Sequence, residues 1–558
     1  MVGAVCRTME GCEHMVKFHT ESLLSRLFLL LSGVACTVLL IMTESKLSFA
    51  VTGLLAVLLL SIFIFRTGFL SRLFVETHWG ICLTAGILAL AEVYRAKSTF
   101  YTTCGGWLWK LFGFLHLPGG LIRFIPWLLA LMALPMLFGY LCWFVRFFWK
   151  HTVDFWNTSD FCERMYLLSA GIVFAILIFI TYSCTQAFYG AHVNGAWYNF
   201  DLIYSADSGY LVHTDVFRNI GADQNDLRQP LFGVFAMPFA QAAWLISKIL
   251  FFLPNGYVIV LQVMEMLLFL VSTVLIARML GLTGYRKALF LGILCVSYPV
   301  LIFSLTAEQY LFAVFYLVLM IYLMDDPLGG SLGYVAATGS MLTSGIFFPL
   351  ITWDRSFRKF VRNTMKLCGI FFAVMILSGR LTTFLDIPSY IEGYGYYTGA
   401  DVPLTSKLMQ YVNFAGSTLA APASHVDFES YRHVSWQMMP VTRWRLTGFL
   451  MLAAAAGGIA VKPKARFTKI CGAWIAFSFL LLGIVGWGTI DNGLMLYSLY
   501  FGWAFIAMAF QLGDFLLSRW PVVEIAAVLL LMLFVGLKNV TALKAALVFA
   551  TQFFPALR

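Results

Sequence analysis

The chain is a series of apolar stretches, each close to the length that crosses a bilayer, separated by shorter polar loops. Such runs lie at residues 23–42, 47–65, 79–95, 121–145, 165–188, 231–253, 258–280, 287–305, 308–324, 331–353, 366–384, 445–461, 470–487, 494–512 and 521–537. A helix needs about 20 apolar residues to span a membrane, and it satisfies its own backbone hydrogen bonds there. The pattern therefore predicts an all-α polytopic membrane protein.

Composition supports this prediction. Hydrophobic residues make up 61% of the 558 residues, charged residues make up 11%, and the mean hydropathy is +0.85. A soluble domain carries about a quarter charged residues. The formal net charge of +10 indicates basic cytoplasmic loops and no nucleic-acid partner, because Lys and Arg accumulate on the cytoplasmic side of a membrane.

Three basic loops orient the spans. Residues 278–287, 354–366 and 462–469 hold three, five and four Lys or Arg residues, respectively. Short loops of this kind are typical of the cytoplasmic side. We therefore expect all three loops in the cytoplasm.

Two conflicts arise if every run crosses the membrane. A crossing by run 231–253 would place the basic loop at 278–287 outside, and a single crossing by run 331–353 would place the loop at 354–366 outside. Both conflicts disappear if run 231–253 lies along the outer membrane face as an amphipathic helix, and if run 331–353 bends near residues 343–345, which read Thr-Ser-Gly. About 13 transmembrane helices remain, with membrane-surface helices in the first large outer loop.

The resulting organisation has four parts. Residues 1–160 form an N-terminal extension of about four spans, and residues 161–384 form the core, with an outer loop at 189–257. A second outer loop follows at 385–444, and residues 445–558 form the C-terminal transmembrane helices. Chemistry on the outer side must then lie in the two large loops.

Five aspartates lie between residues 201 and 226, just beyond the outer end of a span. A solvated acidic loop is the ordinary explanation of such a charge run. Asp207 stands out because "ADSGY" places it at a glycine turn close to the membrane. It could act as a general base, with Asp201 or Asp215 as alternatives, or hold a divalent metal together with Asp215. His213 could support either role or belong to the polar face of a short helix.

Three further ionisable residues lie near the outer ends of apolar runs. Arg228, followed by Gln-Pro, suits a phosphate at the headgroup level, although an arginine at a helix start also snorkels. Glu308 begins an apolar run, where a helix N-terminus favours an acid without any function. Arg380 lies about one turn inside a span and could hold a lipid phosphate or snorkel.

The second outer loop holds another polar cluster, "HVDFESYRH". His425 and Arg432 in it are candidates for substrate binding, and the histidine spacing fits no standard zinc pattern. Glu265 lies deeper in a span, where an ionisable residue is a functional candidate. The aromatic run "YSLYFGW" from Tyr497 is typical of an interfacial belt, although aromatic rings also stack on sugars.

The chain contains no GxxxxGK[ST], GxSxG or HExxH motif. Nucleotide-driven transport by this chain is therefore not expected.

With these residues in view, the layout resembles the GT-C glycosyltransferases, which take sugars from polyprenyl-phosphate carriers. The similarity covers roughly residues 165–510 and includes the mannosyl and aminoarabinose transferases and uncharacterised bacterial relatives. It rests on Asp207 in "DSGYLVHTD", on "RQPLF" from Arg228 and on Glu308 in "SLTAEQY". Many members have Asp-Glu where this chain has Asp207-Ser208, and His-Pro-Pro or Lys-Pro-Pro where it has Arg228-Gln229-Pro230.

The resemblance implies a single displacement on the extracytoplasmic face of a bacterial plasma membrane. The donor is a polyprenyl-phosphate-linked sugar, and the acceptor is a hydroxyl of a glycan, lipid or protein. Asp207 would take the acceptor proton, Arg228 with Arg380 would balance the leaving phosphate, and residues 385–444 would cover the acceptor. Because Asp207-Ser208 stands where many members have Asp-Glu, the resemblance leaves the use of a divalent metal, Mg²⁺ or Mn²⁺, open.

Two other functions fit parts of the sequence. A flippase for lipid-linked glycans would place charged groups at the membrane midplane, often in broken helices, and Glu265 and the bent run 331–353 match that description. The outer acidic cluster argues against it. A glycan polymerase or ligase would share the transferase chemistry and differ in its acceptor and carrier.

Overall fold

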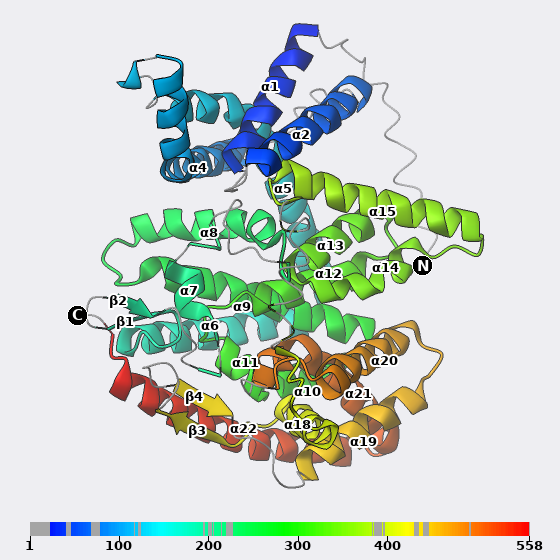
Figure 1. The fold of residues 1–558 in the computed structure, drawn as a ribbon. Coiled ribbons are helices and arrows are strands. Elements are labelled where there is room, and N and C mark those ends of the chain that lie inside the picture. Colours follow the sequence, from blue (N-terminus) through cyan, green and yellow to red (C-terminus); the bar gives the residue numbers. More distant parts are fainter. Residues whose placement is uncertain are drawn as a thin grey trace. The chain divides into compact units, whose positions relative to one another are not determined.

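The structure is a computed structural model that describes residues 23–40, 46–67, 79–116, 118–120, 124–193, 196–198, 203–204, 206–213, 215–218, 227–381, 383, 393, 395, 397–428, 435–438, 446–489 and 493–556. Two compact units divide the chain, residues 1–152 and residues 153–558. Figure 1 shows their helices coloured along the sequence.

The first unit is helical throughout its described part. It contains α1 (Leu23–Leu40), α2 (Lys46–Thr67), α4 (Trp79–Phe114) and most of α5 (Ile125–Thr158). The helix α1 packs against α2 and α4. Within α4, Glu92 is fully buried and forms an ion pair with Arg95 one turn later. Because the two charges pair, the cost of burying Glu92 within this helix of 36 residues is offset.

The second unit is a larger helical bundle. In chain order it contains α6 (Phe161–Cys184), α7 (Ser208–His213), α8 (Phe232–Ile249), α9 (Gly256–Met279), α10 (Gly284–Val296), α11 (Tyr298–Phe303), α12 (Tyr310–Leu323), α13 (Pro327–Ser340), the 3-10 helix η3 (Leu342–Phe347), α14 (Phe348–Thr352), α15 (Phe357–Leu377), α18 (Leu404–Ser417), α19 (Leu446–Val461), α20 (Arg466–Ser478), the π-helix η5 (Phe479–Val485), the 3-10 helix η6 (Gly493–Tyr497), α21 (Ser498–Leu517) and α22 (Pro521–Phe553).

Two short antiparallel hairpins accompany these helices. The strand β1 (Ala191–Val193) pairs with β2 (Ala196–Tyr198), and β3 (Ser424–Asp427) pairs with β4 (Ser435–Met438). A parallel bridge joins Ile203 to Trp436. It connects the two large segments that the sequence places on the outer side.

Nine helices among the described residues are long and apolar enough to cross a membrane. They are α1, α5, α6, α8, α9, α15, α20 continued by η5, α21 with the end of η6, and α22. The chain is therefore an all-α polytopic membrane protein, as predicted from the apolar runs. The total of about 13 spans stays a prediction.

The helix α8 occupies the run expected on the membrane surface. It lies beside α9, to which a short turn connects it (Figure 1). Its mean hydropathy of 1.3 is the lowest among the nine candidate spans. Its length and composition also allow a crossing, so the surface location stays a prediction.

The break expected in run 331–353 is present. The helix α13 ends at Ser340, Met341 is extended, and the 3-10 helix η3 covers residues 343–345. The chain then continues in α14, which is only five residues long. This interruption places backbone polar groups of residues 339–342 where a neighbouring segment can bond to them.

The core centres on α12, which is buried over almost its whole length and contacts α9, α13 and α21.

A glycine lets the helices α19 and α21 approach closely. A Cβ atom at Gly458 of α19 would lie 1.9 Å from the carbonyl oxygen of Met508 in α21. Small residues at such contacts stabilise helix pairs in membranes through van der Waals packing.

A buried ion network joins the start of α6 to the end of α9 and the start of α10. Glu163 accepts from Arg278 at 2.6 Å and from Lys287 at 2.7 Å. Lys287 also lies 2.5 Å from Asp160, which caps α6 in a capping box with Glu163. Each charge is therefore paired, which offsets its cost of burial.

The last helix, α22, is tied to the bundle by a buried amide. The Asn539 side chain donates to the carbonyls of Val296 at 2.7 Å and Leu419 at 2.9 Å. Its oxygen accepts from the amide of Ala421 at 2.7 Å. One side chain thus connects α10, the turn after α18 and α22.

Candidate functional site

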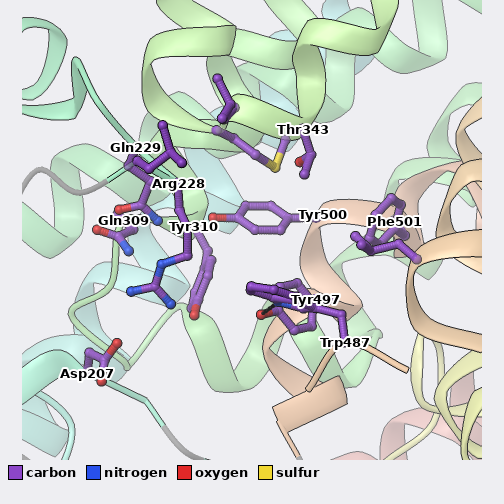
Figure 2. A pocket seen from close by; sticks show the side chains of 14 residues that line it. Asp207, Arg228, Gln229, Gln309, Tyr310, Thr343, Trp487, Tyr497, Tyr500 and Phe501 are labelled. Atoms are coloured by element: carbon purple, nitrogen blue, oxygen red, sulfur yellow. Dashed lines mark hydrogen bonds between the residues drawn. The ribbon is translucent and has the colours of Figure 1, made fainter. Parts of the chain in front are cut away.

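A cavity of about 230 Å³ lies in the second unit and combines polar and aromatic walls (Figure 2). Its lining comes from segments far apart in the sequence. These are Asp207, Leu227, Arg228, Gln229, Gln309, Tyr310, Met341, Leu342, Thr343, Leu481, Trp487, Tyr497, Tyr500 and Phe501. The polar groups gather toward Asp207 and Arg228, and the aromatic rings form the opposite wall.

The loop before Asp207 is anchored by a buried tyrosine. The amide of Tyr204 donates to the carbonyl of Trp436 at 2.7 Å, and its hydroxyl lies 2.6 Å from that of Ser424. Burial raises the pKa of the Tyr204 phenol, and its hydrogen bonds to Ser424 and Tyr298 partly offset that rise. Tyr204 therefore fixes the loop to the strands β3 and β4.

Asp207 itself stands at the start of the short helix α7. Its carbonyl accepts from the amide of Leu211 at 2.9 Å, so the residue occupies the position before the first helical turn. Ser208 and Leu211 are buried beneath it. This arrangement leaves the carboxyl group of Asp207 at the cavity wall.

Arg228 is held by the interruption after α13. The amide of Leu342 donates to the Arg228 carbonyl at 2.8 Å, and the amide of Leu231 donates to the Gly339 carbonyl at 2.8 Å. A Cβ atom at Gly339 would lie 2.5 Å from the Cβ atom of Leu231. The segment 228–231 can therefore reach α13 only because residue 339 has no side chain.

The polar wall brings together groups that can bind an anion and a hydroxyl. The Arg228 guanidinium extends past Gln309 and Tyr310 in the direction of Asp207 (Figure 2). Tyr497 on the other wall lies within electrostatic range of both Arg228 and Asp207. The cavity thus offers a cation, a carboxylate and amide groups within one space.

The aromatic wall is fixed by contacts between its own rings. The Trp487 indole donates to the hydroxyl of Tyr497 at 2.5 Å. The rings of Tyr310 and Tyr500 meet edge to face with centroids 4.9 Å apart. Rigid aromatic faces with polar tips are suited to a ligand that carries both C–H and hydroxyl surfaces, as a sugar does.

A π-helix and a buried lysine position Trp487. The π-helix η5 ends at Val485, and Gly486 follows with a positive φ of 82°. The Lys407 ammonium donates to the carbonyls of Val485 at 3.0 Å and Thr398 at 2.9 Å. Short π-helices often occur at functional sites. Here the π-helix turns the chain so that Trp487 enters the cavity.

The cavity contains two of the candidates from the sequence, Asp207 and Arg228. Glu308 is buried next to the lining residue Gln309 and does not itself line the cavity. Arg380 is buried just after α15 and is not among the lining residues. Among the described candidates, Asp207 and Arg228 are therefore the two that line this cavity.

The remaining described candidates lie elsewhere. Asp215, which has a positive φ of 62°, accepts from the guanidinium of Arg218 at 2.9 Å. His213 is exposed at the end of α7, and His425 is exposed in β3. Asp201 and Arg432 fall outside the described residues.

The structure identifies no metal site in its described part. No group of three or more His, Cys, Asp or Glu side chains is arranged there to hold an ion. The Asp215 carboxylate is engaged by Arg218. A metal held by Asp207 and Asp215 stays a prediction.

Sequence reasoning missed most of the aromatic wall. The run from Tyr497 is typical of an interfacial belt, yet Tyr497, Tyr500 and Phe501 line the cavity. The available signal was the cluster "IVGWGTIDNGLMLYSLYF", where two glycines flank a tryptophan shortly before three aromatic residues. Gln309 also lines the cavity and directly follows the candidate Glu308 in the sequence.

Comparison with known proteins returned no relative: no protein-family model matches the chain, and no match was found among curated proteins or among solved structures.

Proposed function

We propose that this protein is a GT-C type glycosyltransferase that moves a sugar from a polyprenyl-phosphate carrier to an acceptor hydroxyl on the extracytoplasmic face. The supporting observation is that Asp207 and Arg228 line one cavity whose other wall is aromatic. Transfer of this kind needs a base for a hydroxyl proton, a cation for a phosphate and a surface for a sugar. The cavity holds a residue suited to each task.

Arg228 would bind the phosphate of the donor. A guanidinium pairs with phosphate oxygens through two parallel hydrogen bonds, and it stays charged at any physiological pH. As the bond to the sugar breaks, negative charge grows on the phosphate. A fixed cation at that position stabilises the transition state more than the ground state.

Asp207 would act as the general base. The acceptor oxygen attacks the anomeric carbon, and the proton of that hydroxyl moves to the Asp207 carboxylate. The bond between the anomeric carbon and the phosphate oxygen breaks, and its electron pair leaves with polyprenyl phosphate. A single displacement of this kind inverts the anomeric centre, and the carrier bond supplies the energy.

The aromatic residues would hold the sugar ring. Trp487 and Tyr497 are fixed to one another, so their faces lose little freedom when a ligand binds. Gln229 and Gln309 supply amide groups for sugar hydroxyls. The aromatic residues would not determine whether the acceptor is a glycan, a lipid or a protein, nor whether Mg²⁺ or Mn²⁺ is used.

The test is donor cleavage by the purified protein. Wild type and the variants Asp207→Asn and Asp215→Asn would be supplied with polyprenyl-phosphate sugars and acceptor extracts, and released polyprenyl phosphate would be measured. General-base removal costs about 10²- to 10⁴-fold in rate. We expect that loss for Asp207→Asn and near wild-type release for Asp215→Asn, whose carboxylate is engaged by Arg218.

Two results would change the proposal. Loss of release in Asp215→Asn with retention in Asp207→Asn would move the base to Asp215. No release from wild type, together with movement of lipid-linked sugar across a liposome bilayer, would replace the transferase with a flippase.

A further inference from the structure

The first three turns of α15 present two parallel rows of side chains to the surroundings. Phe357, Val361 and Met365 are spaced four residues apart, and 79%, 42% and 68% of their surfaces are exposed. Residues four apart in a helix lie above one another on one face. These three therefore form a continuous apolar row along α15.

The second row is basic and lies directly beside the first. Arg358, Arg362 and Lys366 follow each apolar residue by one position and are exposed, as is Lys359. One residue turns a helix by about 100°. The basic row therefore borders the apolar row along the same stretch of helix.

The remaining face of this stretch contacts the protein. Leu367 is 3% exposed, and the ring of Phe360 contacts those of Phe348 and Trp353. The side-chain amide of Asn363 donates to the carbonyl of Thr352 at 3.4 Å. The two exposed rows are thus fixed in direction by packing against α14, which lies beside α15 (Figure 1).

The basic side chains of this stretch form no ion pair within the part of the chain that the structure describes. Among the described residues no ion pair involves Arg355, Arg358, Lys359, Arg362 or Lys366. Asp354 is the one acidic side chain in this stretch, and it accepts from the amide of Ser356 at 2.8 Å. The surface therefore carries a strong positive charge next to exposed apolar side chains.

We infer that this surface, formed by residues 355–366, binds anionic phospholipid headgroups. An apolar row beside a basic row is the arrangement of a helix that lies at a membrane interface, with the apolar side chains among acyl chains and the cations at the phosphates. The same helix continues as an apolar candidate span to Leu377. The basic row thus stands where α15 leaves the hydrocarbon region and anionic lipid is available. The inference is independent of the proposed transferase activity.

The test measures stabilisation by lipid. The purified protein in a neutral detergent would be titrated with dioleoylphosphatidylglycerol, dioleoylphosphatidylcholine or soluble glycerol 3-phosphate, and its Tm would be recorded at low and high salt. A ligand that binds the native state raises the Tm. We expect phosphatidylglycerol alone to raise it, with a smaller rise at high salt because exposed charges are screened.

Variants identify the surface. The triple variant Arg358→Gln, Arg362→Gln, Lys366→Gln should lose more than about half of the phosphatidylglycerol shift, because basic side chains near an anionic surface contribute similar increments. The matched control Lys462→Gln, Lys464→Gln, Lys469→Gln removes three exposed charges from another basic loop, which has no apolar row beside it. The control should keep most of the shift.

Three outcomes would overturn the inference. They are an equal shift with phosphatidylcholine, an equal shift with glycerol 3-phosphate, or a triple variant that keeps the wild-type shift. If the triple variant does not fold, the single variant Arg362→Gln and the salt dependence of wild type decide in its place.

Discussion

The amide of Leu342 donates a 2.8 Å hydrogen bond to the carbonyl of Arg228. This bond fixes the cation of the candidate site to a helix interruption more than a hundred residues later. The interruption after α13 therefore helps to position the segment that carries the Arg228 side chain. Substitutions that disturb this contact should therefore change activity even at positions that do not line the cavity.

Gly339→Ala tests that connection. The added methyl group would meet the Cβ atom of Leu231 at 2.5 Å and push the segment that carries Arg228 away from α13. Overpacking of this kind costs about 1–3 kcal/mol. We expect a lower Tm and a reduced rate of donor cleavage. The control Gly369→Ala adds a methyl group where nothing lies within 4 Å and should leave both values near wild type.

Arg228→Gln should reduce donor cleavage while the fold is kept. Removing one group that stabilises developing charge costs about 10²- to 10³-fold in kcat. Arg228→Lys should recover part of the rate, because an ammonium keeps the charge and loses the paired hydrogen bonds. Steady-state rates and the Tm of each variant would be measured. A wild-type rate in Arg228→Gln would exclude Arg228 as the phosphate ligand.

Lys407→Met should act through Trp487. The substitution leaves the carbonyls of Val485 and Thr398 without their charged donor, and hydrogen bonds to charged groups contribute roughly 1.5–3 kcal/mol. We expect a lower Tm, and a KM for the donor that rises more than kcat falls, because the aromatic wall binds rather than reacts. Lys464→Met, at an exposed position, is the control. An unchanged KM would separate Lys407 from the cavity.

Asp160 should make stability depend on acid pH. Partial burial by itself would raise its pKa, but the hydrogen bond and charge of Lys287 hold that pKa below the usual value. A lowered pKa stabilises the native state above the ordinary aspartate pKa, near 3.9, and this contribution is lost as the pH falls through the native value. The Tm difference between wild type and Asp160→Asn should therefore shrink below about pH 4. A constant difference from pH 7 to pH 3 would contradict this.

Glu265→Gln separates the transferase from the flippase. Glu265 is 0% exposed in α9, and within the described structure neither carboxylate oxygen has a hydrogen-bond partner. Glutamine keeps the shape and removes the charge, so we expect an equal or higher Tm. Donor cleavage should be unchanged, because Glu265 does not line the cavity. If the variant keeps its fold but no longer moves lipid-linked sugar across a liposome bilayer, a transport pathway through α9 would be supported.

The membrane class and part of the site could be predicted from the sequence, because both depend on local signals. Apolar runs of spanning length identify helices wherever they pack. Asp207 and Arg228 were candidates because charges are conspicuous between such runs. The break after α13 was also predictable, because a single straight crossing by that run conflicts with the orientation expected from the basic loops.

The aromatic wall could not be predicted in this way. Trp487 and Tyr500 resemble any aromatic residues near a membrane boundary. Tyr500 is distinguished by its packing against Tyr310, and Trp487 by its hydrogen bond to Tyr497. The role of Lys407 depends on the end of a π-helix about eighty residues later. Contacts between segments so distant in the sequence leave no periodic pattern in either segment.

The Asn539 amide has a consequence for how the protein is made. The carbonyls of Val296 and Leu419 receive this donor only after α22 has been synthesised. Until then, the helices made earlier lack the hydrogen bonds that Asn539 supplies. Nascent chains that stop before α22 would present these open positions to membrane proteases, so premature termination should yield rapid degradation rather than a shortened, working protein.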